Sequence, residues 1–113
     1  MSTTCLFCRI ASGEISAALV AERESCLAFR DIAPQAPVHV LIIPRTHASS
    51  LNDSSANPVL ADLLALARDV ALQEGIAESG YRVVVNTNDD GGQSVAHLHL
   101  HVLGGRALRW PPG

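Results

Sequence analysis

The stretch Ser94-Val-Ala-His97-Leu-His99-Leu-His101-Val-Leu103 places three of the protein's five histidines at every second position, with leucine or valine between and after them. On a β-strand, successive side chains point to opposite faces, so the three imidazoles would share one face and Leu98, Leu100 and Val102 could face a core. Neighbouring imidazoles would then be roughly 6.5–7 Å apart along the strand. We therefore predict a strand over residues 95–103 that carries a functional row of histidines.

A row of imidazoles suits either a metal ion or an anion. The outer two rings of this row would be roughly 13 Å apart, too far to share one zinc ion bound at about 2.0–2.1 Å per ligand. At most one adjacent pair could chelate, with further ligands from elsewhere in the chain. Alternatively, a neutral imidazole can act as a nucleophile near pH 7, while neighbouring histidines donate hydrogen bonds to a phosphate or protonate a leaving amine. The preceding Gly91-Gly92-Gln93-Ser94 can offer backbone N–H groups and a hydroxyl to phosphate oxygens.

The remaining periodicities predict an α+β protein with an antiparallel sheet, because short loops join consecutive strands. A short helix is expected over residues 4–12, and strands over 16–22, 26–30, 39–44 and 81–86. Asn57 and Pro58 supply an N-cap and a first-turn proline for a main helix over 58–78. Residues 87–93 form a loop that is tightest at Asp90-Gly91-Gly92. The apolar period of the main helix is carried by Leu60, Leu63, Leu64, Ala67, Val70 and Ala71.

Length and composition limit the class of protein. The 113 residues fit one domain, residues 1–113, and 48% hydrophobic with 17% charged residues is typical of globular proteins in solution. A net charge of −3 gives no general attraction to nucleic acid or to a membrane surface, so we expect neither as a partner. We see no apolar run long enough to span a membrane and no signal peptide, and the cysteine count of three is odd. These features favour reduced thiols and a cytoplasmic location.

The histidine stretch and its surroundings resemble the histidine triad (HIT) family, whose signature is His-x-His-x-His with apolar residues between. The likeness spans nearly the whole chain and is greatest to the histidine triad nucleotide-binding (HINT) branch. It implies a HIT-like fold, a homodimer with a sheet continuous across two protomers, and hydrolysis of purine nucleoside phosphoramidates, that is, AMP or GMP linked to an amine. The other matching segments are Phe29-Arg-Asp-Ile-Ala-Pro-Gln-Ala-Pro-Val-His39, Ile43-Pro44, Asn86, Gly91-Gly-Gln-Ser94, Gly104-Gly105 and Trp110-Pro-Pro-Gly113.

The resemblance also implies a role for each matching residue. His99 matches the family's nucleophile, and His101 and His39 match flanking histidines that contact phosphate and relay protons. Ser94 matches a position that can donate a proton toward the leaving amine, and Asp31 matches the carboxylate that binds ribose. Asn86, Gly92, Gln93 and Ser94 match phosphate contacts. The purine slot matches Phe7, Ile15, Phe29, Ile32 and Leu41.

Cys5-x-x-Cys8 is a possible zinc half-site. Other HIT branches join such a pair to two histidines, which here correspond to His47 and His97. A structural zinc ion on these residues would tie the N-terminal helix to the catalytic strand and leave His99 free. The alternative is a pair of cysteines packed beside Phe7 with no ion.

The resulting hypothesis is a nucleoside phosphoramidate hydrolase that works through a nucleotidyl-histidine intermediate and needs no metal ion for its chemistry. Two alternatives stay open. One is a dinucleoside polyphosphate hydrolase or nucleotidyl transferase of a sister HIT branch. The other is a nucleotide-binding adaptor with little turnover.

Overall fold

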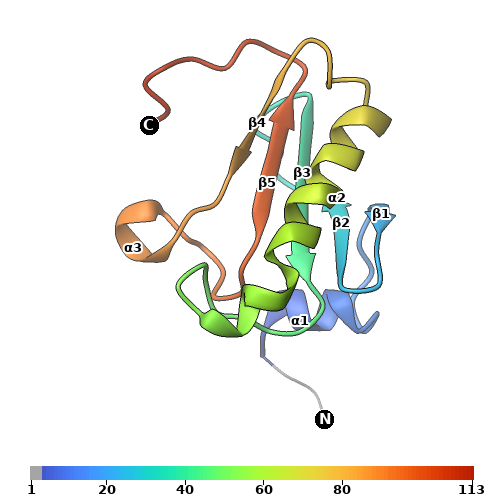
Figure 1. Ribbon diagram of the computed structural model, residues 1–113, viewed down its shortest axis with the longest axis vertical. Helices are drawn as coiled ribbons and strands as arrows, with labels where there is room; N and C mark the ends of the chain where they lie inside the picture. Colours follow the sequence, from blue (N-terminus) through green and yellow to red (C-terminus); the bar gives the residue numbers. More distant parts are fainter. Residues whose placement is uncertain (1–3) are drawn as a thin grey trace.

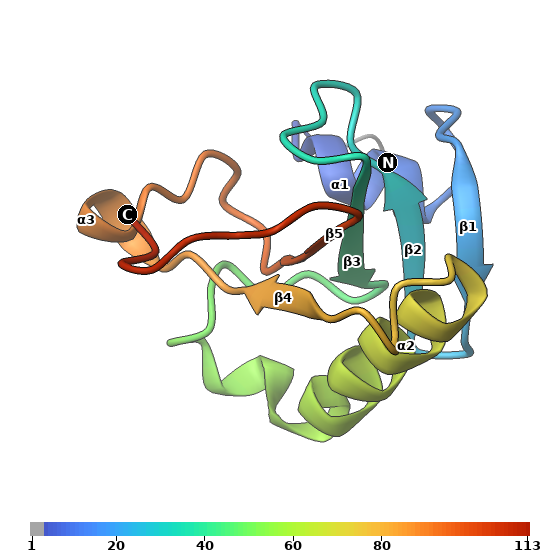
Figure 2. The same ribbon diagram turned by 90° about the horizontal axis from the view of Figure 1, so that it is seen from above.

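The computed structural model, which describes residues 4–113, contains a five-stranded antiparallel sheet with a helix on each face (Figures 1 and 2). The strand order is β1-β2-β3-β5-β4, so β5 is inserted between β3 and β4 and pairs with both. This architecture confirms the α+β class and the pairing of the histidine strand with the strand before it. The elements are α1 (Leu6–Ala11), β1 (Leu19–Glu22), β2 (Cys26–Arg30), β3 (Val38–Pro44), the 3-10 helix η1 (Ser54–Val59), α2 (Leu60–Gln73), β4 (Tyr81–Val84), α3 (Asn88–Gly91) and β5 (Leu100–Gly104).

The two faces of the sheet bury different sets of side chains. Val40 and Ile42 of β3 face α2, whereas Leu41 and Ile43 belong to a second apolar cluster with Phe7 of α1. Figure 2 shows α1 and α2 on opposite sides of the sheet. β-Branched residues dominate β3 because they pack well on a pleated surface that is buried on both sides. The face under α1 is the one that carries the histidines.

The predicted alternation in the histidine stretch is confirmed, but the strand is shorter than expected. Leu98, Leu100 and Val102 all lie in the cluster under α2. Regular strand pairing, however, begins only at Leu100, so the predicted strand over 95–103 is wrong in its first half. The first strand likewise starts at Leu19 and not at residue 16, and residues 88–91 form a helical turn where a loop was expected.

The main helix differs from expectation at both ends. Its N-terminal turn is the 3-10 helix η1, which contains Pro58 and is capped by Asp53, whose side chain accepts a hydrogen bond from the Ser55 N–H; the predicted cap at Asn57 is wrong. The helix ends at Gln73 and not at residue 78, because Gly75 adopts a left-handed conformation with φ of +76° and terminates it.

The buried face of α2 also differs by one position from the predicted one. Leu64, which the sequence analysis placed in the apolar stripe, is exposed, and Leu66, which it did not include, is buried. The buried set follows the i, i+3, i+4, i+7, i+8 pattern of a helix stripe, and both leucines have plausible places in such a pattern. The full set is Leu63, Leu66, Ala67, Val70 and Ala71. Within residues 4–113, no helix combines the length and apolarity that crossing a membrane requires.

The C-terminal end of β5 packs tightly on the segment that follows α2. A Cβ atom at Gly104 would lie 2.6 Å from Cδ1 and 3.3 Å from Cβ of Ile76, which is itself buried. We therefore expect Gly104→Ala to lower the free energy of unfolding by about 1–3 kcal/mol, measured by urea denaturation. Gly91→Ala is the control, because its nearest contact would be an ordinary 3.6 Å. Equal stability of the two variants would contradict this packing argument.

Candidate functional site

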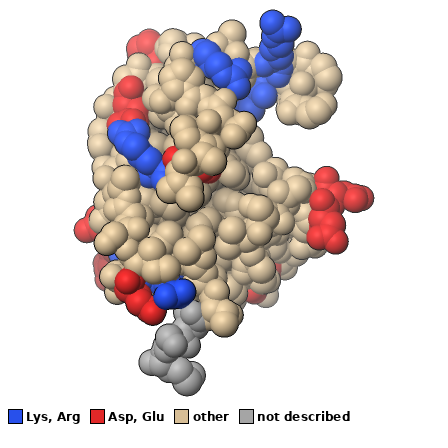
Figure 3. All heavy atoms as spheres, turned by 180° about the vertical axis from the view of Figure 1, so that it is seen from behind, with Lys and Arg blue, Asp and Glu red and all other residues tan. Residues whose placement is uncertain are grey.

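A cavity of about 620 Å³ opens on the sheet face under α1 and brings together most of the predicted nucleotide-binding residues. Figure 3 shows this face hollowed and largely free of charged side chains. Nine of its lining residues were predicted, namely Phe7, Ile15, Phe29, Asp31, Ile32, Leu41, Ser94, His99 and His101. Seven were missed, namely Leu6, Ile10, Ser16, Ala17, Ala18, Arg30 and Val95. The helical spacing of Leu6, Phe7 and Ile10 was a usable signal for α1 as a cavity wall.

Phe7 is the central residue of the apolar wall. Its ring packs edge-on against Phe29, with centroids 5.6 Å apart, and against the imidazole of His99 at 5.1 Å. Because α1 carries Phe7, the position of this helix sets the width of the cavity next to His99. Ile32 lies at the cavity rim and is fully exposed. The wall therefore presents aromatic and aliphatic surface that suits a flat, apolar ligand group.

The tautomer of His99 is fixed by the main chain. Its Nδ1 lies 2.8 Å from the carbonyl oxygen of His97, and a carbonyl can only accept, so Nδ1 carries the proton. In the neutral ring, Nε2 then holds a lone pair. His99 is 4% exposed and lines the cavity. The arrangement gives a desolvated imidazole nitrogen that is free to attack a ligand in the cavity.

A second main-chain contact fixes His39 and, through it, His101. The Gln35 N–H donates to Nδ1 of His39 at 3.0 Å, so the proton of the neutral His39 ring is on Nε2. That Nε2 lies 2.9 Å from Nδ1 of His101, which must accept. His101 therefore carries its proton on Nε2 and can donate it to an anion in the cavity. His39 does not line the cavity and acts from behind His101.

Asp31 has two sets of partners. Its Oδ1 accepts a hydrogen bond from the Ala33 N–H at 2.8 Å, which is a turn contact. Its Oδ2 lies 3.4 Å from Nε2 of His39. The side chain also lines the cavity, so the turn contact leaves carboxylate surface available to a ligand.

Burial disfavours the charged form of His39, His97 and His101. Desolvation lowers the pKa of His39 and of His97 below the usual value of 6.5. Desolvation, with repulsion from His99 and His39, lowers the pKa of His101 to about 4. At neutral pH, His39 and His101 therefore act as hydrogen-bonding groups without charge.

The residues of the predicted phosphate loop divide into two groups. Ser94 lines the cavity, whereas Asn86, Gly92 and Gln93 do not. The Gln93 amide braces the loop, because its Nε2 donates to the carbonyls of Ser49 and Val95 and its Oε1 accepts from the Asn88 N–H. Gly92 ends α3 in a left-handed conformation with φ of +77°.

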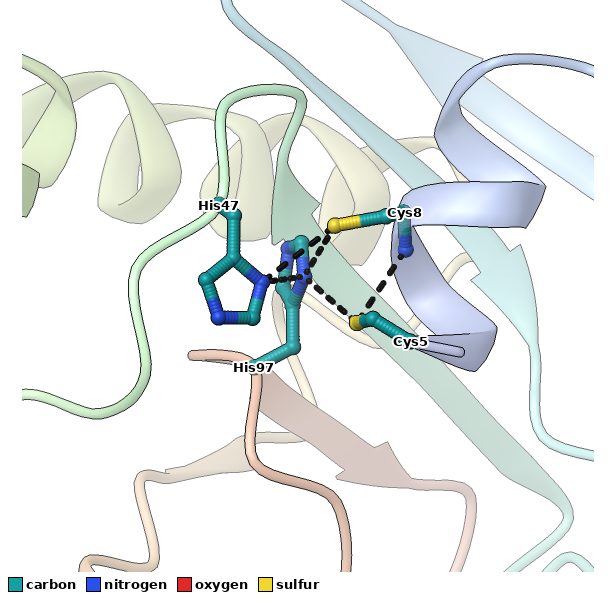
Figure 4. Close-up of side chains that lie close together, drawn as sticks. All are labelled: Cys5, Cys8, His47 and His97. Atoms are coloured by element: carbon teal, nitrogen blue, oxygen red, sulfur yellow. Dashed lines mark hydrogen bonds between the residues drawn. The ribbon is translucent and has the colours of Figure 1, made fainter. Parts of the chain in front are cut away.

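Cys5, Cys8, His47 and His97 form one compact cluster, as the resemblance implied (Figure 4). The two cysteines come from α1 and the turn before it, His47 from the loop after β3, and His97 from the segment before β5. One ligand atom from each lies within 4.8 Å of all the others. Nε2 of His97 donates to the Pro44 carbonyl at 3.0 Å, so its Nδ1 presents a lone pair to the cluster.

The spacing of these atoms fits a tetrahedral zinc ion. With ligands at about 2.0–2.1 Å for nitrogen and 2.3 Å for sulfur, tetrahedral geometry separates two nitrogens by about 3.3 Å and nitrogen from sulfur by about 3.5 Å. The two Nδ1 atoms are 3.1 Å apart, and the three nitrogen–sulfur contacts range from 3.2 to 3.5 Å. Burial and the neighbouring Cys5 raise the pKa of Cys8 to about 11, so a bound cation would be needed to hold this thiol as a thiolate. The donor set and spacing therefore fit zinc.

The low pKa of His101 has a consequence for stability. The unfolded chain binds a proton on this histidine below pH 6.5, whereas the folded chain does so only near pH 4. The free energy of unfolding should therefore fall as pH decreases from 6.5 to about 4, by up to roughly 1.4 kcal/mol per pH unit from this group. His101→Gln cannot ionise and can still accept from His39, so its stability should fall less steeply.

The measurement is urea denaturation of both proteins across this pH range, without added metal. The side chains facing His101 that also titrate are His99, His39 and Asp31, and all three are present in both proteins. The difference between the two curves therefore isolates His101. Parallel curves would contradict the assignment of a buried, neutral ring.

Comparisons with known proteins find related sequences and related structures. The family model described as the HIT domain matches residues 12–108, a range that contains the histidine stretch and begins after Cys5 and Cys8. A HIT-like protein from Synechococcus elongatus is 50% identical over 115 residues, and both chains are covered completely. The crystal structure of a HIT family hydrolase from Legionella pneumophila has 54% identity and a TM-score of 0.93, covering 97% of this chain and 100% of that chain. A histidine triad nucleotide-binding protein from Candida albicans has 32% identity and a TM-score of 0.82, covering 88% and 73%.

Proposed function

Because the chain belongs to the HIT domain family, we propose that it is a hydrolase of purine nucleoside 5′-phosphoramidates, in which AMP or GMP is linked to an amine. The observation that carries the proposal is the unprotonated Nε2 of buried His99 inside an apolar cavity. The similarity to structures described as a HIT family hydrolase and a histidine triad nucleotide-binding protein supports the reaction class and the ligand.

In the first step, Nε2 of His99 attacks the α-phosphorus, and the phosphorus–nitrogen bond breaks. The amine leaves with the bonding electron pair and takes up the hydroxyl proton of Ser94, which lines the cavity. His101 donates its Nε2–H to a phosphate oxygen, and its own Nδ1 is held by His39. The product of this step is a nucleotidyl group on His99.

In the second step, water attacks the same phosphorus, and the bond to His99 breaks. The attacking water gives a proton to the Ser94 oxygen, which restores that hydroxyl, and His99 leaves as a neutral ring with its proton still on Nδ1. The purine lies against Phe7 and Phe29, and Asp31 accepts hydrogen bonds from the ribose hydroxyls. This pose uses the apolar wall for the base and the imidazoles for the phosphate.

We also propose that the protein is a homodimer. β4 is an edge strand of the sheet, so a second copy can extend the sheet there. An extension of this kind would make one sheet from the two five-stranded sheets of the protomers, as the family resemblance implies.

The nucleophile assignment predicts the effect of one substitution. His99→Ala should reduce the turnover of an adenosine 5′-phosphoramidate by about 10⁴-fold or more, because the covalent step loses its attacking atom. AMP should still bind, since the apolar wall and His101 remain. In the unaltered protein, a single-turnover reaction quenched with acid and analysed by peptide mass spectrometry should carry the adenylyl group on His99.

Other outcomes would point elsewhere. Unchanged turnover of the variant would exclude His99 as the nucleophile. Faster cleavage of a dinucleoside polyphosphate than of the phosphoramidate by the unaltered protein would favour a sister HIT activity. Tight binding of AMP without any turnover would favour an adaptor.

We further propose that Cys5, Cys8, His47 and His97 hold a structural zinc ion. Zinc bound there would join α1 to the segment before β5. The lone pair of His97 Nδ1 would then bind the ion. Its place in the fold is structural, because the ring of His97 belongs to the cluster while its carbonyl oxygen holds His99. Removing zinc should therefore loosen α1, whose Phe7 lines the cavity.

Protein purified without added zinc should contain about one zinc ion per chain by atomic emission. Cys8→Ser should lose most of this zinc and should melt at a lower temperature. Cys26→Ala is the matched control, because Cys26 lies in the core under α2, away from the cluster, and should leave the zinc content unchanged. A zinc content that is the same in the Cys8 variant would contradict the site. Complete loss of turnover on chelation, with the fold intact, would favour zinc in the chemistry itself.

A further inference from the structure

Cys5 and Cys8 lie at the start of α1 in a geometry that suits a disulfide as well as a metal ion. Leu6 and Phe7 between them are helical, so the two Cα atoms are about 5 Å apart. Disulfides join cysteines whose Cα atoms are about 4.4–6.8 Å apart. The two sulfur atoms lie within 4.8 Å of each other, and Figure 4 shows both directed toward His97. Rotation of the side chains can therefore join them while α1 stays folded.

The third cysteine is excluded from such a bond by its position. Cys26 is fully buried in the cluster under α2. The helix that carries Cys8 lies on the opposite face of the sheet (Figure 2). The three cysteines of the chain therefore offer one intramolecular pair, Cys5 with Cys8.

The two sulfur atoms of this pair differ in their access to solvent. A second groove, of about 520 Å³, opens beside the nucleotide cavity and is lined by Cys5 together with Thr4 and His47. Cys8 is absent from this lining, and its sulfur contacts His47 and His97. Cys5 is therefore the sulfur that a small solute meets first, and Cys8 is the thiol beside it. Redox-sensing cysteines have this arrangement of an accessible sulfur and a neighbouring resolving cysteine.

We propose that Cys5 and Cys8 form a reversible redox site, in which a peroxide joins the two sulfur atoms in a disulfide, releases the metal ion and weakens nucleotide binding. The release of metal rests on the proposed zinc site, and the effect on nucleotide binding rests on the proposed nucleotide cavity. The disulfide itself rests on neither.

The reaction balances with hydrogen peroxide as the oxidant. The Cys5 thiolate attacks one peroxide oxygen, the oxygen–oxygen bond breaks, and Cys5 becomes a sulfenic acid while hydroxide leaves. The Cys8 thiolate then attacks the Cys5 sulfur, and the sulfur–oxygen bond breaks to release a second hydroxide. Two protons from solvent convert both hydroxides to water. Each sulfur has then given up one electron, and a dithiol such as dithiothreitol can return both.

The disulfide and a bound zinc ion exclude each other. Two sulfur ligands on a tetrahedral zinc ion are about 3.8 Å apart, whereas a disulfide brings them to about 2.05 Å. Zinc binds thiolates, and a disulfide has none. The two histidines that remain, His47 and His97, supply only half of the usual four ligands of a structural zinc site. Oxidation should therefore release the ion.

Phe7 connects the cysteine pair to the nucleotide cavity. It lies between the two cysteines in sequence, and its ring packs against His97 at 5.9 Å and against His99 at 5.1 Å. Drawing the two sulfur atoms together reorients the first turn of α1 and with it this ring, which lines the cavity. We expect AMP to bind about fivefold more weakly to the oxidised protein, which is the size of effect expected from one aromatic contact.

The test uses the full-length Cys26→Ala protein, in which Cys5 and Cys8 are the only cysteines. The protein is treated with hydrogen peroxide, quenched with catalase, alkylated with iodoacetamide under denaturing conditions and digested with trypsin. The peptide of residues 1–9, which ends at Arg9, should carry no alkyl group and should be lighter by two hydrogen atoms than the reduced peptide. A chromogenic chelator should detect zinc release in parallel with this change.

Isothermal titration calorimetry with AMP reads the effect on the cavity. The affinity should fall about fivefold after peroxide treatment and return after dithiothreitol and zinc are added. The control adds Cys5→Ser and Cys8→Ser to the same protein, and peroxide should not change its AMP affinity. Thermal melts show whether this control is folded. If it is not, recovery in dithiothreitol supplies the control, because dithiothreitol does not reverse oxidation of other side chains.

Two outcomes would overturn the inference. Alkylated Cys5 and Cys8 after peroxide treatment, or sulfinic acid without a disulfide, would exclude a reversible redox site. A disulfide that leaves AMP affinity unchanged would exclude the link to the nucleotide cavity.

The readouts also separate this inference from the earlier proposals. If the disulfide forms and AMP affinity falls in protein that contains no zinc, the zinc proposal is wrong and the redox site stands. If zinc stays bound and no disulfide forms, the redox site is wrong and the zinc proposal stands. If AMP does not bind the reduced protein, the proposed nucleotide function is wrong, and the mass of the peptide still decides whether the redox site exists.

Discussion

The hydrogen bond from the His99 ring to the main-chain carbonyl of His97 is the constraint on which the rest of the site depends. This bond places the proton of the neutral His99 ring on Nδ1 and leaves Nε2 without one. The acceptor is a main-chain carbonyl, which does not titrate. The Pro44 carbonyl likewise fixes the tautomer of His97, and the Gln35 N–H fixes that of His39. Main-chain groups thus assign opposite tasks to side chains that are chemically identical.

His97 links two parts of the molecule because its side chain and its main chain face different partners. The ring takes part in the cluster with Cys5 and Cys8, and the carbonyl oxygen orients His99. Phe7, which lies between the two cysteines in sequence, packs against both His97 and His99. The same few contacts therefore hold the cysteine–histidine cluster, the cavity wall and the candidate nucleophile His99. A displacement of α1 would change the position of all three.

Sequence periodicity predicted the parts of the fold that depend on alternation. The leucine and valine side chains between the histidines pack under α2 as expected, because a period of two is a strong constraint on a buried strand. The cavity wall was predicted from the family resemblance, as was the pairing of the Cys5-x-x-Cys8 motif with His47 and His97. In both cases the structure brings together residues that are distant in the chain and that no local pattern relates.

Other features could not be predicted because they depend on competition between similar local choices. Leu64 and Leu66 both fit a helical stripe, and only the position of the sheet decides that Leu66 is buried. Asp53 and Asn57 are both residue types that favour the N-cap position. Asp53 is the cap in the structure, and its carboxylate accepts hydrogen bonds from the N–H groups of Ser49 and Ser55. The histidine tautomers are set by main-chain atoms of Pro44, His97 and Gln35. Every residue type has such main-chain atoms, so the sequence does not predict these bonds.

The electrical character of the cavity affects how a ligand arrives. Arg30 and Asp31 are the charged residues in its lining, and Arg30 is paired with Glu74 at 2.6 Å. His101 in its lining is held neutral by burial. Such a surface has little long-range field with which to draw an anion from solution. Capture of a nucleotide should therefore proceed at an ordinary diffusional rate that changes little with ionic strength, and discrimination should reside in how long the ligand stays.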